Sequence, residues 1–153
     1  MTFPFTYTNK VEVQFDEKKH TPENLLDSVI KSLQKAKAKN VKNNLNHITF
    51  TGGIFRLVTN WNILGSISSG EITIERNKDK LCLKYHLKFT EMLIIVTVGV
   101  FGFLGIGIYQ ASNLTNIHKI IMLIIAWLWL FGGNYMVTIF RFPKFINEMT
   151  EIE

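Results

Sequence analysis

Two apolar stretches decide the fold of this chain: MLIIVTVGVFGFLGIGIY at residues 92–109 and IIMLIIAWLWLFGGNYMVTI at residues 120–139. A short polar segment, QASNLTNIHK, lies between them. A helix of about 20 apolar residues crosses the hydrocarbon core of a bilayer, so each stretch is about one span long. The sequence therefore predicts a two-helix transmembrane hairpin at residues 90–140, with spans at about 92–109 and 118–139.

The rest of the chain is polar enough to predict a small soluble domain in front of this hairpin. Residues 1–89 are expected to form that domain, which can bury a modest core, and residues 141–153 are expected to be a short tail. The N-terminus MTFPFTYTNK has no basic leader followed by an apolar core. We therefore expect no cleavable signal peptide, and membrane insertion would depend on the hairpin itself.

Hydrophobic periodicity in residues 1–89 predicts one helix and about five strands. Apolar and polar residues alternate at 7–15, which is typical of a half-buried strand. Thr21-Pro22-Glu23 is a helix start signal, and the helix is expected to run from Pro22 into the Lys39–Asn46 region. Further strands are expected at 47–51, 54–58, 71–76 and 81–89, and residues 61–64 are apolar enough for one more, which is left open. The predicted fold class is α+β, in the order β-α-β-β-β-β, with one helix on an antiparallel or mixed sheet.

Basic residues are concentrated in the soluble part. The first 88 residues carry 14 Lys and Arg against 8 Asp and Glu, whereas the remainder carries 3 against 4. Between the spans lies Lys119, and near their other ends lie Arg76, Lys78, Lys80, Lys84, Lys88, Arg141 and Lys144. By the positive-inside rule, both termini are expected on the cytoplasmic side of a membrane, such as a bacterial inner membrane.

Six lysines form a candidate surface for anionic lipid or a protein partner: Lys31, Lys35, Lys39, Lys42, Lys84 and Lys88. The first four fall on one side of the expected helix. Near a cytoplasmic leaflet each would gain about 1 kcal/mol from anionic lipid. The alternative is that they form only the solvated face of an amphipathic helix. Nucleic acid is an unlikely partner because aromatic residues are not interleaved with the lysines.

Small residues in the spans predict close helix packing. They are Gly99, Gly102 and Gly105 in the first span and Ala126, Gly132 and Gly133 in the second. In an antiparallel hairpin, Gly99 comes level with Gly132, and Gly105 with Ala126. Such pairs permit close backbone approach, so a seam between the two helices is expected there.

Three polar or aromatic side chains inside the second span also call for partners. Asn134 is expected to hydrogen-bond across a helix interface. Trp127 and Trp129 lie near mid-depth, where an interfacial aromatic belt does not explain them. We expect each tryptophan to face lipid or to pack on a partner.

Patterns that carry catalysis or bind metals do not occur in the sequence. The single cysteine, Cys82, has no second thiol for a disulfide or a metal site. The four histidines lack zinc-ligand spacing. Ser66, Ser68 and Ser69 lie near glycines without a nucleophile-elbow pattern. We therefore expect no catalytic residue, cofactor or metal ion.

These features favour a non-enzymatic integral inner-membrane protein that presents a small cytoplasmic α+β domain. It would act as an accessory, scaffold or assembly subunit, with the lipid bilayer and other membrane subunits or a second copy as partners. Two alternatives stay open. Asn134 and the glycine-rich spans suit a homo-oligomeric channel or transporter component. His86, Glu91 or the serines suit a membrane-surface lipid-binding protein or enzyme.

Overall fold

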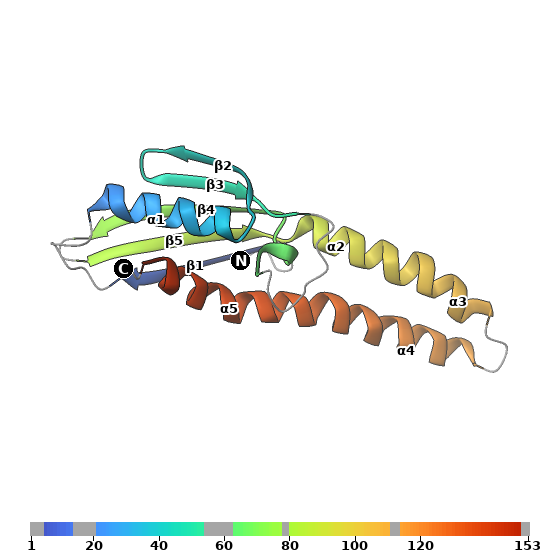
Figure 1. The fold of residues 1–153 in the computed structure, drawn as a ribbon. Coiled ribbons are helices and arrows are strands. Elements are labelled where there is room, and N and C mark those ends of the chain that lie inside the picture. The colour runs from blue at the N-terminus through green and yellow to red at the C-terminus, as the bar shows by residue number, and fades with distance from the viewer. Residues whose placement is uncertain (1–4, 14–20, 54–62, 78–79, 111–113, 151–153) are drawn as a thin grey trace.

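The structure, a computed structural model, describes residues 5–13, 21–53, 63–77, 80–110 and 114–150. It is an elongated molecule with a sheet-and-helix domain at one end and two long helices projecting from it (Figure 1). The strands are β1 (Thr6–Val13), β2 (Lys39–Asn44), β3 (His47–Thr51), β4 (Ser69–Asn77) and β5 (Lys80–Lys88). They form a five-stranded sheet in the order β1-β5-β4-β3-β2, in which every neighbouring pair is antiparallel. The predicted α+β class with an antiparallel sheet is confirmed.

Helix α1 (Pro22–Lys35) begins as its sequence predicts. The Thr21 Oγ1 atom accepts a hydrogen bond from the backbone N–H of Asn24 at 3.2 Å, and Pro22 occupies the first helical position. The helix ends earlier than expected, in a left-handed turn at Lys37, whose φ is 63°. The N–H of Lys37 bonds to the Gln34 carbonyl and that of Ala38 to the Leu33 carbonyl, both at 2.8 Å, which is a Schellman motif.

Strand β2 corrects the prediction for the Asn- and Lys-rich segment after this turn. The segment was expected to hold the end of the helix, but Lys39–Asn44 forms the edge strand beside β3. Apart from the half-buried Val41, its side chains are exposed. Because the edge strand has no buried face, it lacks the apolar alternation by which a strand is identified in a sequence.

The region between β3 and β4 also differs from the prediction. The strand expected at 54–58 lies outside the described residues, as does the start of the one expected at 61–64. Ile63–Ser66 forms a short 3-10 helix, η1, instead of a strand. The N-terminal element order is therefore β-α-β-β followed by η1 and the hairpin of β4 and β5.

Strand β4 begins two residues before the predicted start, at Ser69. Gly70 makes this possible, because a Cβ atom there would lie 2.2 Å from the ring of Phe50. The inward side chains of β4 and β5 are buried as predicted; they are Ile72, Ile74, Leu81, Leu83, Tyr85 and Leu87. They form the core together with Leu25, Val29 and Leu33 of α1.

Two long helices follow β5. The first, Thr90–Gln110, consists of α2 (Thr90–Thr97), a π-helical segment η2 (Val98–Leu104) and α3 (Gly105–Gln110). The second, Asn116–Thr150, consists of α4 (Asn116–Trp127), a π-helical segment η3 (Leu128–Gly132) and α5 (Gly133–Thr150). They lie side by side as a hairpin (Figure 1).

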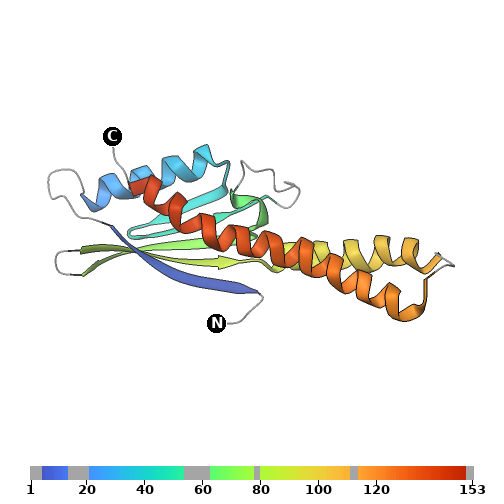
Figure 2. The ribbon, with the colours of Figure 1, turned by 90° about the horizontal axis from the view of Figure 1, so that it is seen from below.

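The segment expected to be a short tail is the end of α5. Phe142, Ile146 and Met149 are buried, and their spacing is that of one helix face. The Ser28 hydroxyl of α1 donates to the Met149 carbonyl at 2.6 Å. Helices α1 and α5 therefore lie side by side on the same face of the sheet (Figure 2), where only one helix was expected.

Candidate functional site

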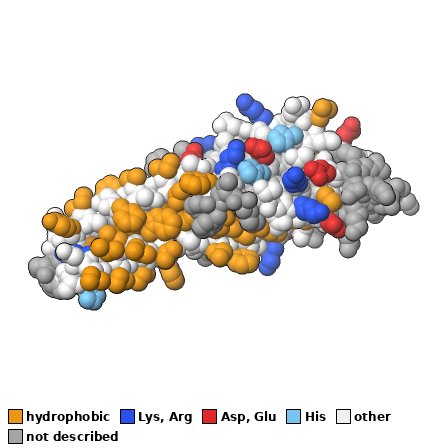
Figure 3. All heavy atoms as spheres, turned by 180° about the vertical axis from the view of Figure 1, so that it is seen from behind, with side chains coloured by type: hydrophobic (Ala, Val, Ile, Leu, Met, Phe, Trp, Pro, Cys, Tyr) orange, Lys and Arg blue, Asp and Glu red, His pale blue; other side chains and the backbone are white. Residues whose placement is uncertain are grey.

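The hairpin exposes its apolar surface. Its helices of 21 and 35 residues are long and apolar enough to cross a membrane. A core helix of a soluble protein would be mostly buried. In the most apolar 18-residue segment of each helix, only 6% of the residues of the first helix and 11% of those of the second are buried. Hydrophobic side chains cover the hairpin, whereas the domain displays basic, acidic and histidine side chains (Figure 3).

Buried contacts join the hairpin to the domain. The Phe89 ring lies 4.8 Å from that of Tyr135, between centroids, in an edge-on arrangement. Farther into the domain, Tyr85 and Phe142 lie 4.9 Å apart. These pairs connect the end of the sheet with α5, so the hairpin and the domain share one continuous core.

Two of the serines considered as nucleophiles have structural hydrogen bonds at this junction. The Ser66 and Thr138 hydroxyls are buried and hydrogen-bond each other, and Thr138 also donates to the Asn134 carbonyl at 2.8 Å. The Ser68 Oγ accepts from the backbone N–H of Glu91 at 2.8 Å. It thereby satisfies one of the free N–H groups of the first turn of α2.

The small residues of the spans do not form the predicted seam. A Cβ atom added at Gly99, Gly132 or Gly133 would meet no atom within 4 Å. At Gly102 and Gly105 it would meet only atoms of the same helix, Val98 at 4.0 Å and the Val100 carbonyl at 3.8 Å. The glycines therefore do not face the other helix closely, and the contact between the helices that the structure does show is made by Trp127, which hydrogen-bonds Thr97 of the first helix.

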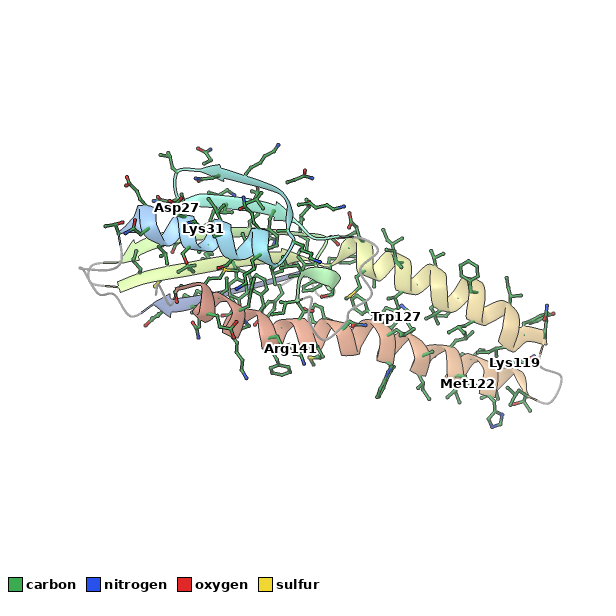
Figure 4. The ribbon with its side chains drawn as sticks, in the orientation of Figure 1. Asp27, Lys31, Lys119, Met122, Trp127 and Arg141 are labelled. Carbon is green, nitrogen blue, oxygen red and sulfur yellow. The ribbon has the colours of Figure 1, made fainter. Side chains whose placement is uncertain are left out.

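Trp127 makes the interhelical hydrogen bond that was expected from Asn134. Its Nε1 atom donates to Thr97 Oγ1 at 3.0 Å, and its ring stacks on the buried Phe131 at 5.1 Å (Figure 4). Asn134 instead donates to the Leu130 carbonyl of its own helix at 2.5 Å. Trp129 is 78% exposed and faces outward. Sequence reasoning overlooked Thr97 because a single threonine in an apolar span gives no pairing signal.

The six candidate lysines lie on three elements, and the four that were expected on one side of a single helix are divided between α1 and β2. Lys31 and Lys35 are exposed on α1, and Lys39 and Lys42 on β2. Lys84 and Lys88 project from β5 on the sheet face opposite the helices, and Lys88 pairs with Glu71 at 3.4 Å. The lysines therefore cannot act as a single stripe.

The sheet face opposite the helices is polar and open. A shallow hollow of about 390 Å³ lies on it, lined by Thr8, Glu71, Thr73, Glu75, Lys84, Tyr85 and His86. His86 Nδ1 hydrogen-bonds Thr8 Oγ1 at 2.6 Å, and His47 Nδ1 bonds Thr73 Oγ1 at 3.1 Å. The sequence predicted that Lys84 and His86 share this face, but only the strand register brings Thr8 and Glu71 beside them.

One titratable group in the described part of the domain has a strongly shifted pKa. Burial raises the pKa of Tyr85 to about 12, which keeps its phenol neutral. Cys82 is buried, and the described residues hold no group of three His, Cys, Asp or Glu side chains that could bind a metal ion. Comparison with known protein families, curated proteins and solved structures finds no match for this chain.

Proposed function

We propose that this chain is an integral membrane protein whose hairpin crosses the bilayer twice and holds the α+β domain rigidly at one surface. The domain acts by binding, as a non-enzymatic accessory, scaffold or assembly subunit of a membrane complex. The observation that carries the proposal is the path of α5. This helix begins among exposed apolar residues and ends in the core of the domain.

Rigid attachment supports a positioning role. A single residue, Phe89, separates β5 from α2, and α4 continues through η3 into α5 without a loop. The ring contacts of Phe89 and Phe142 then hold both helices to the sheet. A tethered domain would sample many orientations, whereas this domain presents its open face at a fixed height and angle.

The open sheet face is the surface proposed to bind a partner subunit. Its side chains are small, polar or of both charges, including Thr8, Thr73, Glu71, Lys84 and His86. Such a face suits the polar surface of another protein, where complementary charges set specificity. The hollow is shallow and its hydrogen bonds are between its own side chains, so it favours surface recognition over chemistry on a small molecule.

The topology follows from the same contacts. Because α1 and α5 pack on one sheet face, the N-terminal domain and the end of the second span lie on the same side of the hairpin. By the positive-inside rule, the basic residues near that side support the proposal that it faces the cytoplasm of a cell such as a bacterium.

Cysteine labelling tests insertion and topology in intact cells. The native Cys82 is buried, so background labelling is low. Asn116→Cys, at the start of α4, is expected to react with an impermeant maleimide from outside, and Asn147→Cys, exposed on α5, only after permeabilisation. The opposite pattern would reverse the orientation, and equal labelling of both in intact cells would exclude the hairpin topology.

Site-specific cross-linking tests the binding role. A photoreactive side chain at Thr73 on the open face is expected to trap a membrane-complex subunit, which also co-purifies stoichiometrically in mild detergent. The matched control carries the same group at Lys31, which is exposed on α1 over the opposite sheet face (Figure 4). Adducts only with a second copy of this chain would favour the homo-oligomeric alternative, and the absence of any specific adduct at Thr73 would contradict the proposal.

A further inference from the structure

The strand register shows which residues of neighbouring strands lie at the same distance from the hairpin. Strand β5 runs toward the hairpin and ends at Lys88, two residues before α2 begins. The row of paired residues at that end crosses the whole sheet; it consists of Thr6, Lys88, Ser69, Thr51 and Lys39. Two lysines, Lys39 and Lys88, therefore lie at the level where the exposed apolar surface begins.

The two helices bring further cations to the same end. Helix α1 finishes beside this row, because the chain passes from Lys35 through Lys37 to Lys39. On α5, Phe140 is 71% exposed and Arg141 follows it (Figure 4). Side chains of a helix lean toward its N-terminus, which on α5 is the hairpin end. The Cα–Cβ bond of Arg141 therefore tilts toward the hairpin end of α5.

Acidic side chains are concentrated at the far end of the domain. Glu12 and Glu75 lie opposite Cys82, six residues along β5 from Lys88, which is about 20 Å away. Glu23 and Asp27 lie in the first half of α1, which is the half farther from the hairpin, and Glu148 lies near the end of α5. Two of the described acidic side chains, Glu71 and Glu91, lie instead at the end near the hairpin.

We infer that the hairpin end of the domain binds anionic phospholipid headgroups through a basic rim. The basic rim consists of Lys35, Lys37, Lys39, Lys42, Lys88 and Arg141. This inference rests on the proposed membrane function and deepens it by naming the lipid class. It also divides the candidate lysines, since Lys31 and Lys84 are excluded from the rim.

Distance decides which charges contact the headgroups. The potential of an anionic leaflet decays within a Debye length, about 10 Å at 0.1 M salt. Lys39 and Lys88 lie at the boundary between the domain and the hairpin. Arg141 lies six residues, or about 9 Å, along α5 from Tyr135, whose ring contacts that of Phe89 at this boundary. The acidic end, about 20 Å away, is screened. Within the rim Lys88 is paired with Glu71 at 3.4 Å, so the attraction comes mainly from the other rim residues.

Lipid competition in nanodiscs tests the inference with the full-length chain. The protein is reconstituted in mixed phosphatidylglycerol and phosphatidylcholine, and the lipids that it retains are counted by native mass spectrometry. Wild type is expected to retain phosphatidylglycerol preferentially. In the rim variant Lys35→Gln/Lys39→Gln this preference is expected to fall about 25-fold, because each of the two lysines contributes about fivefold.

The matched control is Lys10→Gln/Lys84→Gln, which removes the same charge. These two lysines pair across β1 and β5 about 13 Å from the rim row. A change of less than twofold is expected for this control. Equal losses in the two variants, or no phosphatidylglycerol preference in wild type, would overturn the inference. Carbonate extraction of the same protein from vesicles measures whether the chain is inserted in the bilayer, and it separates the proposed membrane function from the proposed rim. A chain that is not inserted refutes the membrane function. An inserted chain without lipid preference refutes only the rim.

Discussion

Replacing Phe142 by alanine tests whether the last part of α5 belongs to the core of the domain. Phe142 is fully buried, and its ring lies 4.9 Å from that of Tyr85. A buried Phe→Ala change costs about 3–5 kcal/mol, through lost burial and the cavity that remains. A small domain has a total stability of about 5–15 kcal/mol, so the variant should lose at least about a fifth of it.

The assay is urea unfolding of the domain in detergent-solubilised full-length protein, followed by near-UV circular dichroism. With an m value of about 1.5 kcal/mol/M, a loss of 4 kcal/mol lowers the midpoint by about 2.5 M. The control is Phe140→Ala, because Phe140 is on the same helix but is 71% exposed. The midpoint of this control should stay within about 0.3 M of wild type. If the two variants had equal midpoints, α5 would not be part of the folded domain and the proposed rigid attachment would fail.

Three further features lead to separate predictions. Lys37→Gly should raise stability by about 0.5–1 kcal/mol, because glycine adopts the φ of 63° without strain. Lys37→Ala should not raise it, and equal urea midpoints for the two variants would contradict this. Trp127→Phe and Thr97→Val should be non-additive by about 0.6 kcal/mol in a double-mutant cycle of hairpin stability, and strict additivity would mean that their 3.0 Å hydrogen bond contributes nothing. The pKa of Tyr85, about 12, exceeds its ordinary value of 10.0, so the unfolded chain releases the proton first and stability should fall from pH 10 toward 12. Tyr85→Phe should abolish that fall, and an unchanged pH profile would contradict this. It should also raise stability by about 1 kcal/mol at pH 7, since it removes a hydroxyl that is buried without a hydrogen-bond partner in the described part of the chain.

Local signals predicted much of the domain because they reflect burial on one face. The alternation in β5 predicted that Leu83, Tyr85 and Leu87 face inward, and they are buried. Strand β2 was missed because an edge strand of exposed polar residues has no such periodicity. The end of α5 did carry a signal, since Phe142, Ile146 and Met149 follow helical spacing. Pro143 and the charged residues around them concealed that pattern.

The candidate surfaces were harder to predict because they depend on pairs of distant residues. Gly99 and Gly132 have the composition of a packing seam, but whether backbones approach depends on the side chains between them. A Cβ atom at either glycine would meet no atom within 4 Å, so neither glycine faces the other helix closely, which residue type alone does not reveal. Likewise, grouping Lys39 with Lys88 required the register of the intervening strands.

The order of elements along the chain makes the hairpin part of the folding of the domain. The sheet and α1 are complete in sequence by Lys88, but their apolar face stays open until Phe142, Ile146 and Met149 cover it. Those residues follow the whole hairpin, so they reach the sheet only when the second helix returns to the side where the first began. A chain that inserted with its end on the opposite side would leave this core exposed. Burial of the end of α5 therefore favours the same proposed topology as the proposed basic rim does, through the hydrophobic effect instead of charge.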